Sequence, residues 1–329
     1  MQKIRIGIVG YGNLGKGAEL GIMQNKDMEL VAVFTRRNPD SIQLKTNDAK
    51  VYSINEITFM TKEIDVMLLC GGSLTDIPVQ GPEIAALFNT VDGFDTHKKI
   101  PDYYATMDEI AKKSKKVSII ATGWDPGMFS LNRLIANSIL PEGDTYTFWG
   151  EGISQGHSDA LRRVEGVQDG LQYTIPISEA VDEVRSGKRP KLSVKDRHKR
   201  ICYVVLKDGY SEKKIEQEII NMPNYFAEYD TKVEFISQEE LNENHKGLPH
   251  GGYVIRSGVT GINNEHNQII EYKIKLDSNP EFTANILLAY VRAAYRLNKE
   301  GQTGAKTLFD IAPGYLSILS PEDLRRSLL

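Results

Sequence analysis

The sequence predicts an α/β protein with a doubly wound parallel sheet and an inserted, mixed-sheet α+β domain. Three observations predict this architecture. The chain opens with a short apolar segment that leads into the pattern Gly10-x-Gly12-x-x-Gly15. Short apolar segments then alternate with helical ones, which indicates right-handed crossovers and a parallel sheet. From about residue 126 the apolar segments are longer and are separated by single helices or irregular stretches, which indicates a separate sheet.

The first strand is expected at residues 4–9, and the glycines after it indicate a dinucleotide-binding turn of the Rossmann type. Glycines allow a tight turn, a close approach of the backbone to a pyrophosphate, and a helix N-terminus aimed at negative charge. A helix over 14–23 and a strand over 30–34 complete a unit of about 30 residues. The expected cofactor-binding residues of this turn are Gly10, Tyr11, Gly12, Asn13, Leu14 and Gly15.

The second strand ends in Thr35, Arg36 and Arg37, at the place where an NAD-binding protein carries an acidic ligand for the ribose 2′-hydroxyl. Two guanidinium groups suit a 2′-phosphate, which they can bind through bidentate hydrogen bonds. The alternative is two solvated charges at a strand end. The three residues therefore predict NADP rather than NAD.

Further strands are expected at 66–70, 89–92 and 117–121, with helices near 81–88 and 103–114. Ligands of parallel sheets bind beyond the carboxyl ends of the strands, so the polar segments after these strands are expected to converge on one cleft. These segments contain candidate cofactor contacts at Cys70, Gly71, Gly72, Ser73 and Thr75, and the acids Asp95 and Asp125. For Asp125, which precedes a proline, the alternative is a simple turn residue.

The expected domain boundaries are 1–125 for the dinucleotide-binding domain, to which 302–329 returns, and 126–301 for the substrate-binding and dimerisation domain. The strands of this second domain are expected at 145–149, 171–175, 201–206, 232–236 and 268–276. A long helix is expected over 282–297, and Ser320 marks the start of another.

The composition argues against several classes of protein. A net charge of −4 argues against nucleic acid or an anionic membrane as the main partner. No segment approaches the ~20 apolar residues of a membrane span, and the N-terminus leads into a strand without a secretory signal, so a cytoplasmic location is expected. Cys70 and Cys202 are expected to be reduced core residues. No motif with metal-ligand spacing occurs, so we expect no metal.

The second domain contains one unusual polar segment, residues 150–163, in which three glycines accompany Ser, Gln, His and Asp side chains. Such a backbone suits close approach to a ligand, with Gln155, Gly156 and Asp159 as candidates. The alternative is a helix start with Ser158 as its N-cap and Asp159 complementing the helix dipole, and both interpretations can hold together.

Two basic residues further along the chain are candidates for binding an anion. Arg200 precedes an apolar strand, so an exposed charge at a strand start is the alternative. His250 lies between Pro249 and two glycines, in a segment that we expect to be a loop with no apolar face to bury it. Acids that suit an ammonium group and bases that suit a carboxylate favour an amino-acid substrate, with the nicotinamide supplying the redox chemistry.

With these residues in view, the sequence resembles the meso-diaminopimelate dehydrogenase family along nearly its whole length. The motifs that carry the resemblance are Gly10 to Gly15, Thr35-Arg36-Arg37 and residues 123–130, 148–150, 154–160, 222–226, 248–252 and 279–283.

The resemblance implies NADP-dependent, reversible oxidative deamination of meso-2,6-diaminopimelate at its D centre, an oxidoreductase reaction of lysine and diaminopimelate biosynthesis. The products are L-2-amino-6-oxopimelate, ammonium and NADPH. The resemblance implies that Thr174, Arg200 and His250 bind the distal carboxylate, with Asn279 nearby. It implies that Asp95 and Asp125 are catalytic residues that contact the amino groups, and that Trp124 and Trp149 form walls of the pocket. Gln155, Gly156 and Asp159 are implied to position the reacting end. The general base stays unassigned.

Other functions compatible with the sequence are a sugar-oxidising or dihydrodipicolinate-reductase-like NADP enzyme and a non-catalytic NADPH sensor. The sugar-oxidising group carries Glu-Lys-Pro where this chain reads His97-Lys98-Lys99-Ile100-Pro101, which argues against it. A sensor would lose the second site, whereas Arg200 and His250 are present. A homodimer is expected through the second domain, because long strands with alternating apolar positions offer a sheet face for isologous packing.

Overall fold

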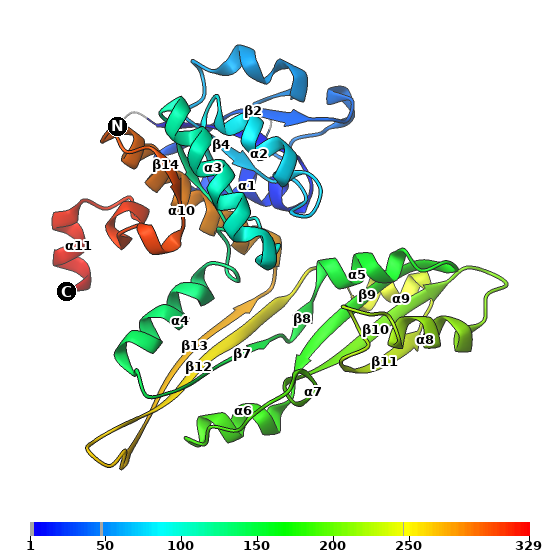
Figure 1. Cartoon of the computed structure of the whole chain (residues 1–329). Helices are drawn as coiled ribbons and strands as arrows, with labels where there is room; N and C mark the ends of the chain where they lie inside the picture. The colour runs from blue at the N-terminus through cyan, green and yellow to red at the C-terminus, as the bar shows by residue number, and fades with distance from the viewer. Residues whose placement is uncertain (1–2, 47–48, 246) are drawn as a thin grey trace. The chain divides into compact units, whose positions relative to one another are not determined.

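The structure of the protein is a computed structural model that describes residues 3–46, 49–245 and 247–329. The chain forms two compact units, Met1–Leu131 with Pro280–Leu329, and Asn132–Asn279 (Figure 1). The expected boundaries at 125/126 and 301/302 differ from these mainly at helix α10 (Asn279–Lys299), which belongs to the first unit from Pro280 onward. The reason is a buried ion pair, in which Arg292 Nε lies 2.6 Å from the carboxylate of Asp27.

The first unit contains a seven-stranded, all-parallel sheet in the order β14-β6-β5-β4-β1-β2-β3. This confirms the predicted doubly wound fold. Two short strands, β3 and β14, were not predicted. The strands are β1 (Ile4–Val9), β2 (Met28–Thr35), β3 (Lys50–Ser53), β4 (Val66–Leu69), β5 (Asn89–Asp92), β6 (Val117–Ile119) and β14 (Gly304–Lys306).

Helices cover both faces of this sheet. The 3₁₀ helix η2 (Ile54–Met60) and α2 (Ile77–Ala85) share one apolar cluster with the sheet residues Phe34 and Met67. Helix α1 (Asn13–Gln24) approaches α10 closely, since a Cβ on Gly17 would meet the backbone of Glu281 at 3.0 Å. This unit also contains the α-helices α3 (Ile100–Ser114) and α11 (Pro321–Leu328).

The second unit contains two sheets, where the sequence indicated one. A four-stranded mixed sheet has the order β11-β10-β9-β8, and a three-stranded antiparallel sheet has the order β13-β12-β7. The strands are β7 (Gly143–Trp149), β8 (Gly152–Ile153), β9 (Val167–Pro176), β10 (His198–Leu206), β11 (Asp230–Phe235), β12 (His250–Thr260) and β13 (His266–Leu276). The helices are α5 (Gln155–Arg162), α6 (Ser178–Arg185), α7 (Val194–Arg197), α8 (Glu212–Ile220) and α9 (Gln238–Asn244), and α4 (Met128–Ile139) joins the two units.

The expectation of a loop around His250 was wrong. His250 is the first residue of β12, and its side chain is buried. The adjacent Gly251 is also a residue of β12, and it must be glycine because a Cβ there would collide with the carbonyl oxygen of Ile274 on β13. Sequence reasoning mistook the segment for a turn, whereas close packing of β12 against β13 leaves no room for a side chain at Gly251.

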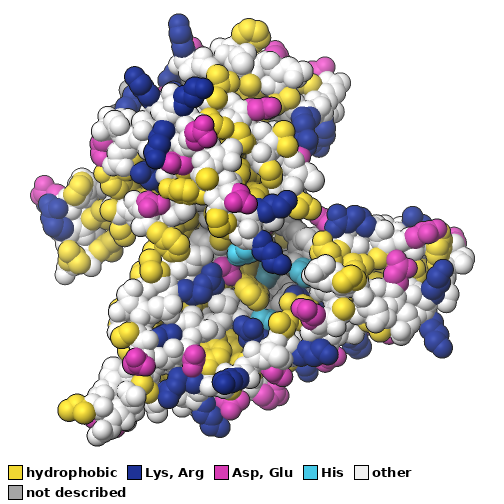
Figure 2. All heavy atoms as spheres, in the orientation of Figure 1, with side chains coloured by type: hydrophobic (Ala, Val, Ile, Leu, Met, Phe, Trp, Pro, Cys, Tyr) yellow, Lys and Arg dark blue, Asp and Glu magenta, His cyan; other side chains and the backbone are white. Residues whose placement is uncertain are grey.

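The described helices do not include one with the length and apolar character needed to cross a lipid bilayer. On the face in Figure 2, basic and acidic side chains are interspersed, in keeping with a net charge of only −4. Cys70 and Cys202 are buried and free, as expected, and burial raises the pKa of each thiol to about 12.

Candidate functional site

The turn after β1 has the geometry of an anion-binding cradle. Gly10 has a φ of +91°, which favours glycine, and a Cβ on Gly15 would overlap the carbonyl oxygen of Gly10. Gly12 faces open space and precedes α1, whose first turn has no side-chain cap and no acidic residue. The N-terminal amides of α1 are therefore available to a phosphate.

The residues after β2 bring two guanidinium groups to this turn. The Oγ1 atom of Thr35 accepts a hydrogen bond from the amide of Arg37 at 3.1 Å, and the Arg37 guanidinium donates to the carbonyl of Tyr11 at 2.8 Å. Arg36 lies 2.8 Å from the carboxylate of Asp76, which sequence reasoning did not include among the cofactor contacts. The arrangement places two positive charges beside the cradle, and Asp76 offsets one of them.

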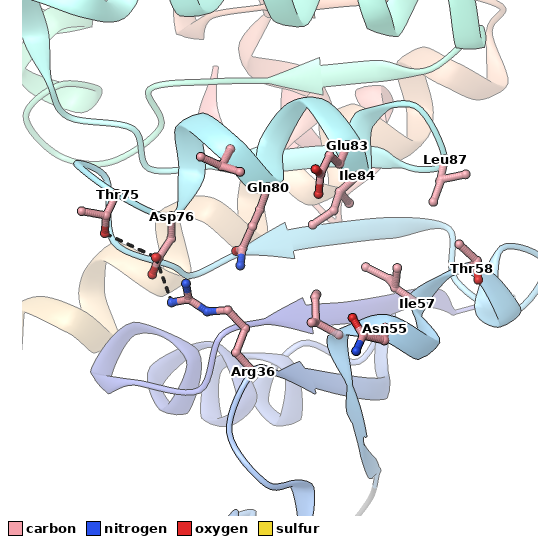
Figure 3. Close-up of a pocket in the computed structure, with 12 residues that line it drawn as sticks. Arg36, Asn55, Ile57, Thr58, Thr75, Asp76, Gln80, Glu83, Ile84 and Leu87 are labelled. Atoms are coloured by element: carbon pink, nitrogen blue, oxygen red, sulfur yellow. Dashed lines mark hydrogen bonds and ion pairs between the residues drawn. The ribbon is translucent and has the colours of Figure 1, made fainter.

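A cavity of about 520 Å³ opens beside Arg36, between η2 and α2 (Figure 3). Arg36 and Asp76 meet at one end of it, and Thr58 and Leu87 lie at the other. The Asp76 carboxylate also accepts a hydrogen bond from the amide of Gly72 at 3.0 Å, so this acid connects the end of β2 to the loop after β4.

The loops after β4, β5 and β6 are joined by hydrogen bonds. Ser73 Oγ accepts from the amide of Asp95 at 2.8 Å. The buried carboxylate of Asp92 accepts from the amide of Ala121 at 3.2 Å, at the start of the loop that carries Trp124 and Asp125. The predicted residues Ser73, Asp95 and Asp125 therefore lie on connected loops of one unit.

In the second unit, Arg200 is a buried cation. Its side chain donates to the hydroxyl of Thr174, and its guanidinium lies over the ring of Tyr229, 4.0 Å from the centroid. Only 5% of Arg200 is exposed, and its Nε has no hydrogen-bond partner among the described residues. No carboxylate of the described residues lies within ion-pair distance of the Arg200 guanidinium. A buried guanidinium with an unsatisfied Nε and no acidic partner is the expected receptor for a carboxylate ligand.

The charge of Arg200 acts on three histidines, of which His198 and His250 are buried and His157 is half-buried. Burial together with this charge lowers the pKa of His157 to about 4, of His198 to about 3 and of His250 to about 4. All three are therefore neutral at pH 7. We call Thr174, Arg200, Tyr229 and these histidines the Arg200 cluster.

His198 also explains the placement of Trp149. Its Nε2 accepts a hydrogen bond from the Trp149 amide at 2.8 Å, and the two rings stack with centroids 5.3 Å apart. The backbone amide of Asn279 donates to the carbonyl of Leu248 at 2.9 Å, which places Asn279 beside the segment that leads into His250.

Gln155, Gly156 and Asp159 all lie on α5, which begins at Gln155. Ser158 is inside this helix, where its hydroxyl donates to the carbonyl of Ser154, so the alternative of Ser158 as an N-cap was wrong. Asp159 forms an ion pair with Arg162. An added Cβ on Gly156 would meet no atom within 4 Å, so open space adjoins this turn of the helix.

Comparison with known proteins identifies the family. A family model described as the diaminopimelic acid dehydrogenase C-terminal domain matches residues 123–278. The meso-diaminopimelate D-dehydrogenase of Acetivibrio thermocellus is 66% identical over 100% of this chain and 98% of its own. The chain belongs to the meso-diaminopimelate dehydrogenase family. This confirms the resemblance predicted from the sequence.

Solved structures of the family have the same fold. A variant of the Clostridium tetani enzyme, solved with DAP and carrying six substitutions, has a TM-score of 0.93 at 54% identity, covering 99% of this chain and 100% of its own. An engineered D-amino acid dehydrogenase bound to NADP⁺ has a TM-score of 0.88 at 42% identity, covering both chains fully.

Sequence reasoning missed five residues that this geometry brings forward. They are Asp76, Asp92, His157, His198 and Tyr229. For four of them a signal was present, because Asp76, Asp92, His157 and His198 lie in polar segments at strand ends or in the 150–163 segment. Tyr229 had none, since its contact with Arg200 depends on tertiary packing. Among the described residues, no group of three or more His, Cys, Asp or Glu side chains could hold a metal ion.

Proposed function

We propose that this protein is an NADP-dependent oxidoreductase that reversibly deaminates meso-2,6-diaminopimelate at its D centre, releasing ammonium and forming L-2-amino-6-oxopimelate. The observation that carries this proposal is the buried, unpaired guanidinium of Arg200, in a chain 66% identical to a curated enzyme of this name. The reaction would serve lysine and diaminopimelate biosynthesis.

The first unit would bind the cofactor. The cradle after β1 fits a pyrophosphate, because Gly15 leaves no room for a Cβ and α1 presents uncapped amides. Arg36 and Arg37 would bind the 2′-phosphate of NADP. Cys70, Gly71, Gly72, Ser73 and Thr75 would line the path of the nicotinamide half. An NADP⁺ complex of an engineered relative supports this assignment. When bound, the nicotinamide accepts the hydride from the D-centre Cα.

The second unit would hold the distal end of the substrate. Thr174, Arg200 and His250 would bind the L-centre carboxylate, with Asn279 beside them, and Trp149 would form a wall of the pocket. The Clostridium tetani variant with DAP supports this proposal, because it replaces Gln, Thr, Arg, Pro, His and Asn residues. In this chain the same residue types occur in that order at Gln155, Thr174, Arg200, Pro249, His250 and Asn279.

At the reacting end, the D-centre nitrogen must donate its lone pair as the hydride leaves, so the amine must be neutral. Asp95 and Asp125 would hold the amino groups and are the candidates for accepting the proton, with Trp124 as a second wall. Gln155, Gly156 and Asp159 would position this end. Loss of the C–H hydride gives an imine, which water attacks, and ammonium leaves.

We also propose a cytoplasmic homodimer. Leu134, Ile135 and Ile139 of α4 and Ile269 of β13 are exposed apolar side chains of the second unit, which would be covered in a dimer. Free, buried thiols and an NADP cofactor suit the cytoplasm. A monomer in sedimentation at micromolar concentration would argue against the dimer, and reversal of dimerisation by Ile139→Lys would locate its interface.

The test is the appearance of NADPH at 340 nm with meso-, LL- and DD-diaminopimelate offered separately, with NADP⁺ and with NAD⁺. The proposal expects activity with the meso compound and much less with the LL compound, which has no D centre. Faster oxidation of a sugar with NADP⁺, or faster reduction of cyclic dihydrodipicolinate with NADPH, would overturn it.

A further inference from the structure

We propose that Asp92 is a positioning residue for the reaction, which fixes the loops that carry Asp95 and Asp125 while touching no ligand itself. This inference rests on the proposed function, because it assumes that these two acids face the substrate amines. It concerns the first unit alone, where all the groups involved lie within residues 73–129.

Asp92 is the last residue of β5, and none of its surface is exposed. One carboxylate oxygen, Oδ1, accepts from the amides of Phe94 at 3.0 Å and Ala121 at 3.2 Å. The other oxygen, Oδ2, accepts from the hydroxyl of Tyr103 at 2.8 Å. A single side chain therefore holds the first turn after β5, which leads to Asp95, and the second residue after β6, Ala121, which leads to Asp125.

The connection to Asp125 continues through the backbone. Ala121 adopts a φ of +53°, a left-handed conformation that is unfavourable for alanine. The next amide is bound to the same residue, because the amide of Thr122 donates to the backbone carbonyl of Asp92 at 2.9 Å. Asp92 therefore accepts from the amides of both Ala121 and Thr122. The β5–β6 backbone ladder ends at Val91 and Ile119, so the two bonds to Asp92 extend the pairing into the loop.

The far end of the same loop is closed by a tight turn. Gly127 has a φ of +137°, and a Cβ there would overlap the backbone of Gly123. The amides of Met128 and Phe129 donate to the carbonyls of Gly123 and Trp124 at 2.9 and 2.7 Å. The loop is thus a short, well-bonded turn, and a shift at Ala121 is transmitted to Trp124 and Asp125.

A carboxylate that served only the fold would lower the stability of the protein at this position. No cation lies within ion-pair distance of Asp92 among the described residues, and burial raises its pKa to about 6. A buried, unpaired charge costs stability, and an apolar residue would avoid that cost. What the carboxylate supplies is three acceptor positions, of which two fix the loops.

The test compares Asp92→Ala and Asp92→Asn with Thr90→Val, all in the full-length enzyme. Thr90 is the matched control, because it lies in the same strand, is equally buried, and donates only to Ser118 Oγ in the sheet. Asparagine can keep the network, since its carbonyl can accept from both amides and its NH₂ can donate to the Tyr103 oxygen. The measurements are kcat and KM for meso-diaminopimelate, and the Kd of NADPH.

We expect Asp92→Ala to lower kcat/KM by about tenfold or more, with the Kd of NADPH within about twofold of native. Asp92→Asn should have a kcat/KM within about threefold of native. Thr90→Val should also have a kcat/KM within about threefold of native, even if its Tm is lower. A folded Asp92→Ala variant with native kcat/KM, or an equal loss in Thr90→Val, would overturn the proposal.

Tryptophan emission gives a second measurement that is independent of activity. The chain has two tryptophans, so a Trp149→Phe background leaves Trp124 as the only one. We expect its emission to shift to the red with Asp92→Ala and to stay unchanged with Thr90→Val and Asp92→Asn. Native enzyme inactive on diaminopimelate would refute the proposed function, whereas an unchanged Trp124 emission would refute the role of Asp92.

If Asp92→Ala does not fold, Asp92→Ser takes its place, because a serine hydroxyl can accept from the amide two residues on but is too short to reach Ala121. It should shift the Trp124 emission while keeping cofactor binding. Whether Asp92→Ala folds or not, Asp92→Asn separates the effect of the negative charge from that of loop positioning. A tenfold loss of kcat/KM with unchanged emission would show that the negative charge matters and that positioning does not.

Discussion

The turn after β1 and the Arg200 cluster differ in what they present to a ligand. The turn presents backbone, in which Gly10 and Gly15 remove side chains and α1 supplies amides. The Arg200 cluster presents buried and half-buried side chains from separate strands, helix α5 and a loop, arranged around one charge. Backbone amides recognise a group common to many cofactors, whereas a buried cation surrounded by neutral histidines selects one kind of anion at one position. Generality and selectivity thus come from different parts of the chain.

The largest effect should come from removing the charge of the Arg200 cluster. Arg200→Met keeps most of the side-chain volume but removes the guanidinium that we propose binds the distal carboxylate. Truncating one partner of a buried charge pair costs about 2–5 kcal/mol, so kcat/KM for meso-diaminopimelate should fall by about 30-fold or more. The Kd of NADPH should not change. Arg200→Lys keeps the charge without the planar guanidinium, so its kcat/KM should lie between those of the native enzyme and of Arg200→Met.

The same substitution separates function from stability. A buried guanidinium with an unpaired Nε is a cost to the fold, and an apolar replacement of similar volume is often neutral or stabilising. We therefore expect the Tm of Arg200→Met to equal or exceed that of the native protein. A clear fall in Tm would mean that the arginine is a structural residue.

The backbone cradle offers the opposite test. Gly12→Ala adds a Cβ into open space, so the Tm should stay native while the Kd of NADPH rises by about tenfold or more, because the methyl group stands where the pyrophosphate approaches. Gly15→Ala is the contrasting variant, since its Cβ overlaps the Gly10 carbonyl and should lower both affinity and Tm. Isothermal titration and thermal melting measure the two. If Gly12→Ala bound NADPH normally, the turn would not be the cofactor site.

A smaller effect is expected at the 2′-phosphate. Arg36 is 62% exposed and already paired with Asp76, so its contribution is screened by solvent, whereas Arg37 is held against the turn by Tyr11. The double change Arg36→Ser with Arg37→Ser should weaken NADP⁺ by about tenfold or more and leave NAD⁺ unchanged. Arg37→Ser should account for more of the loss than Arg36→Ser. Equal efficiency of the native enzyme with both cofactors would contradict the assignment.

The smallest effect concerns the histidines of the Arg200 cluster. The pKa values of His157 and His250 are lowered from the ordinary 6.5 to about 4, so the unfolded chain takes up protons between pH 6.5 and about 4 that the native protein does not. Their contribution to stability is complete above pH 6.5 and is lost as the pH falls toward 4. Thermal melts over this range should show Tm falling with pH, and less steeply in His157→Asn. A steeper fall in that variant would contradict the neutral state of this ring.

The contrast between the two regions also explains what the sequence could reveal. The turn after β1 is built from consecutive residues, so Gly10, Gly12, Gly15 and the arginines were readable from spacing. The Arg200 cluster depends on pairing between β9 and β10, which sets Arg200 opposite Thr174. That register is not visible in the sequence. Arg200 and Thr174 were named through family resemblance, and the contact with Tyr229 was not predicted.

The errors in the fold have similar causes. Strand β12 was missed because its first three residues are His250-Gly251-Gly252, a composition typical of turns. Strands β3 and β14 are the two edges of the sheet, and neither has the run of buried apolar residues that marks the equally short β4. Helix α10 was found, but its position in the first unit depends on the Asp27–Arg292 ion pair between residues far apart in the chain.

The interrupted first unit affects how the protein is made. Strand β6 ends at Ile119, and its edge partner β14 begins at Gly304, with the whole second unit encoded between them. At about 5–20 residues per second, a ribosome needs roughly ten to forty seconds to cover that interval. During this time the second unit can fold. Strand β6 is then an edge strand without its partner β14, and Asp27 has not yet formed its ion pair with Arg292. The nascent chain therefore carries an open strand edge, which chaperones or neighbouring chains can engage until the last fifty residues, 280–329, emerge.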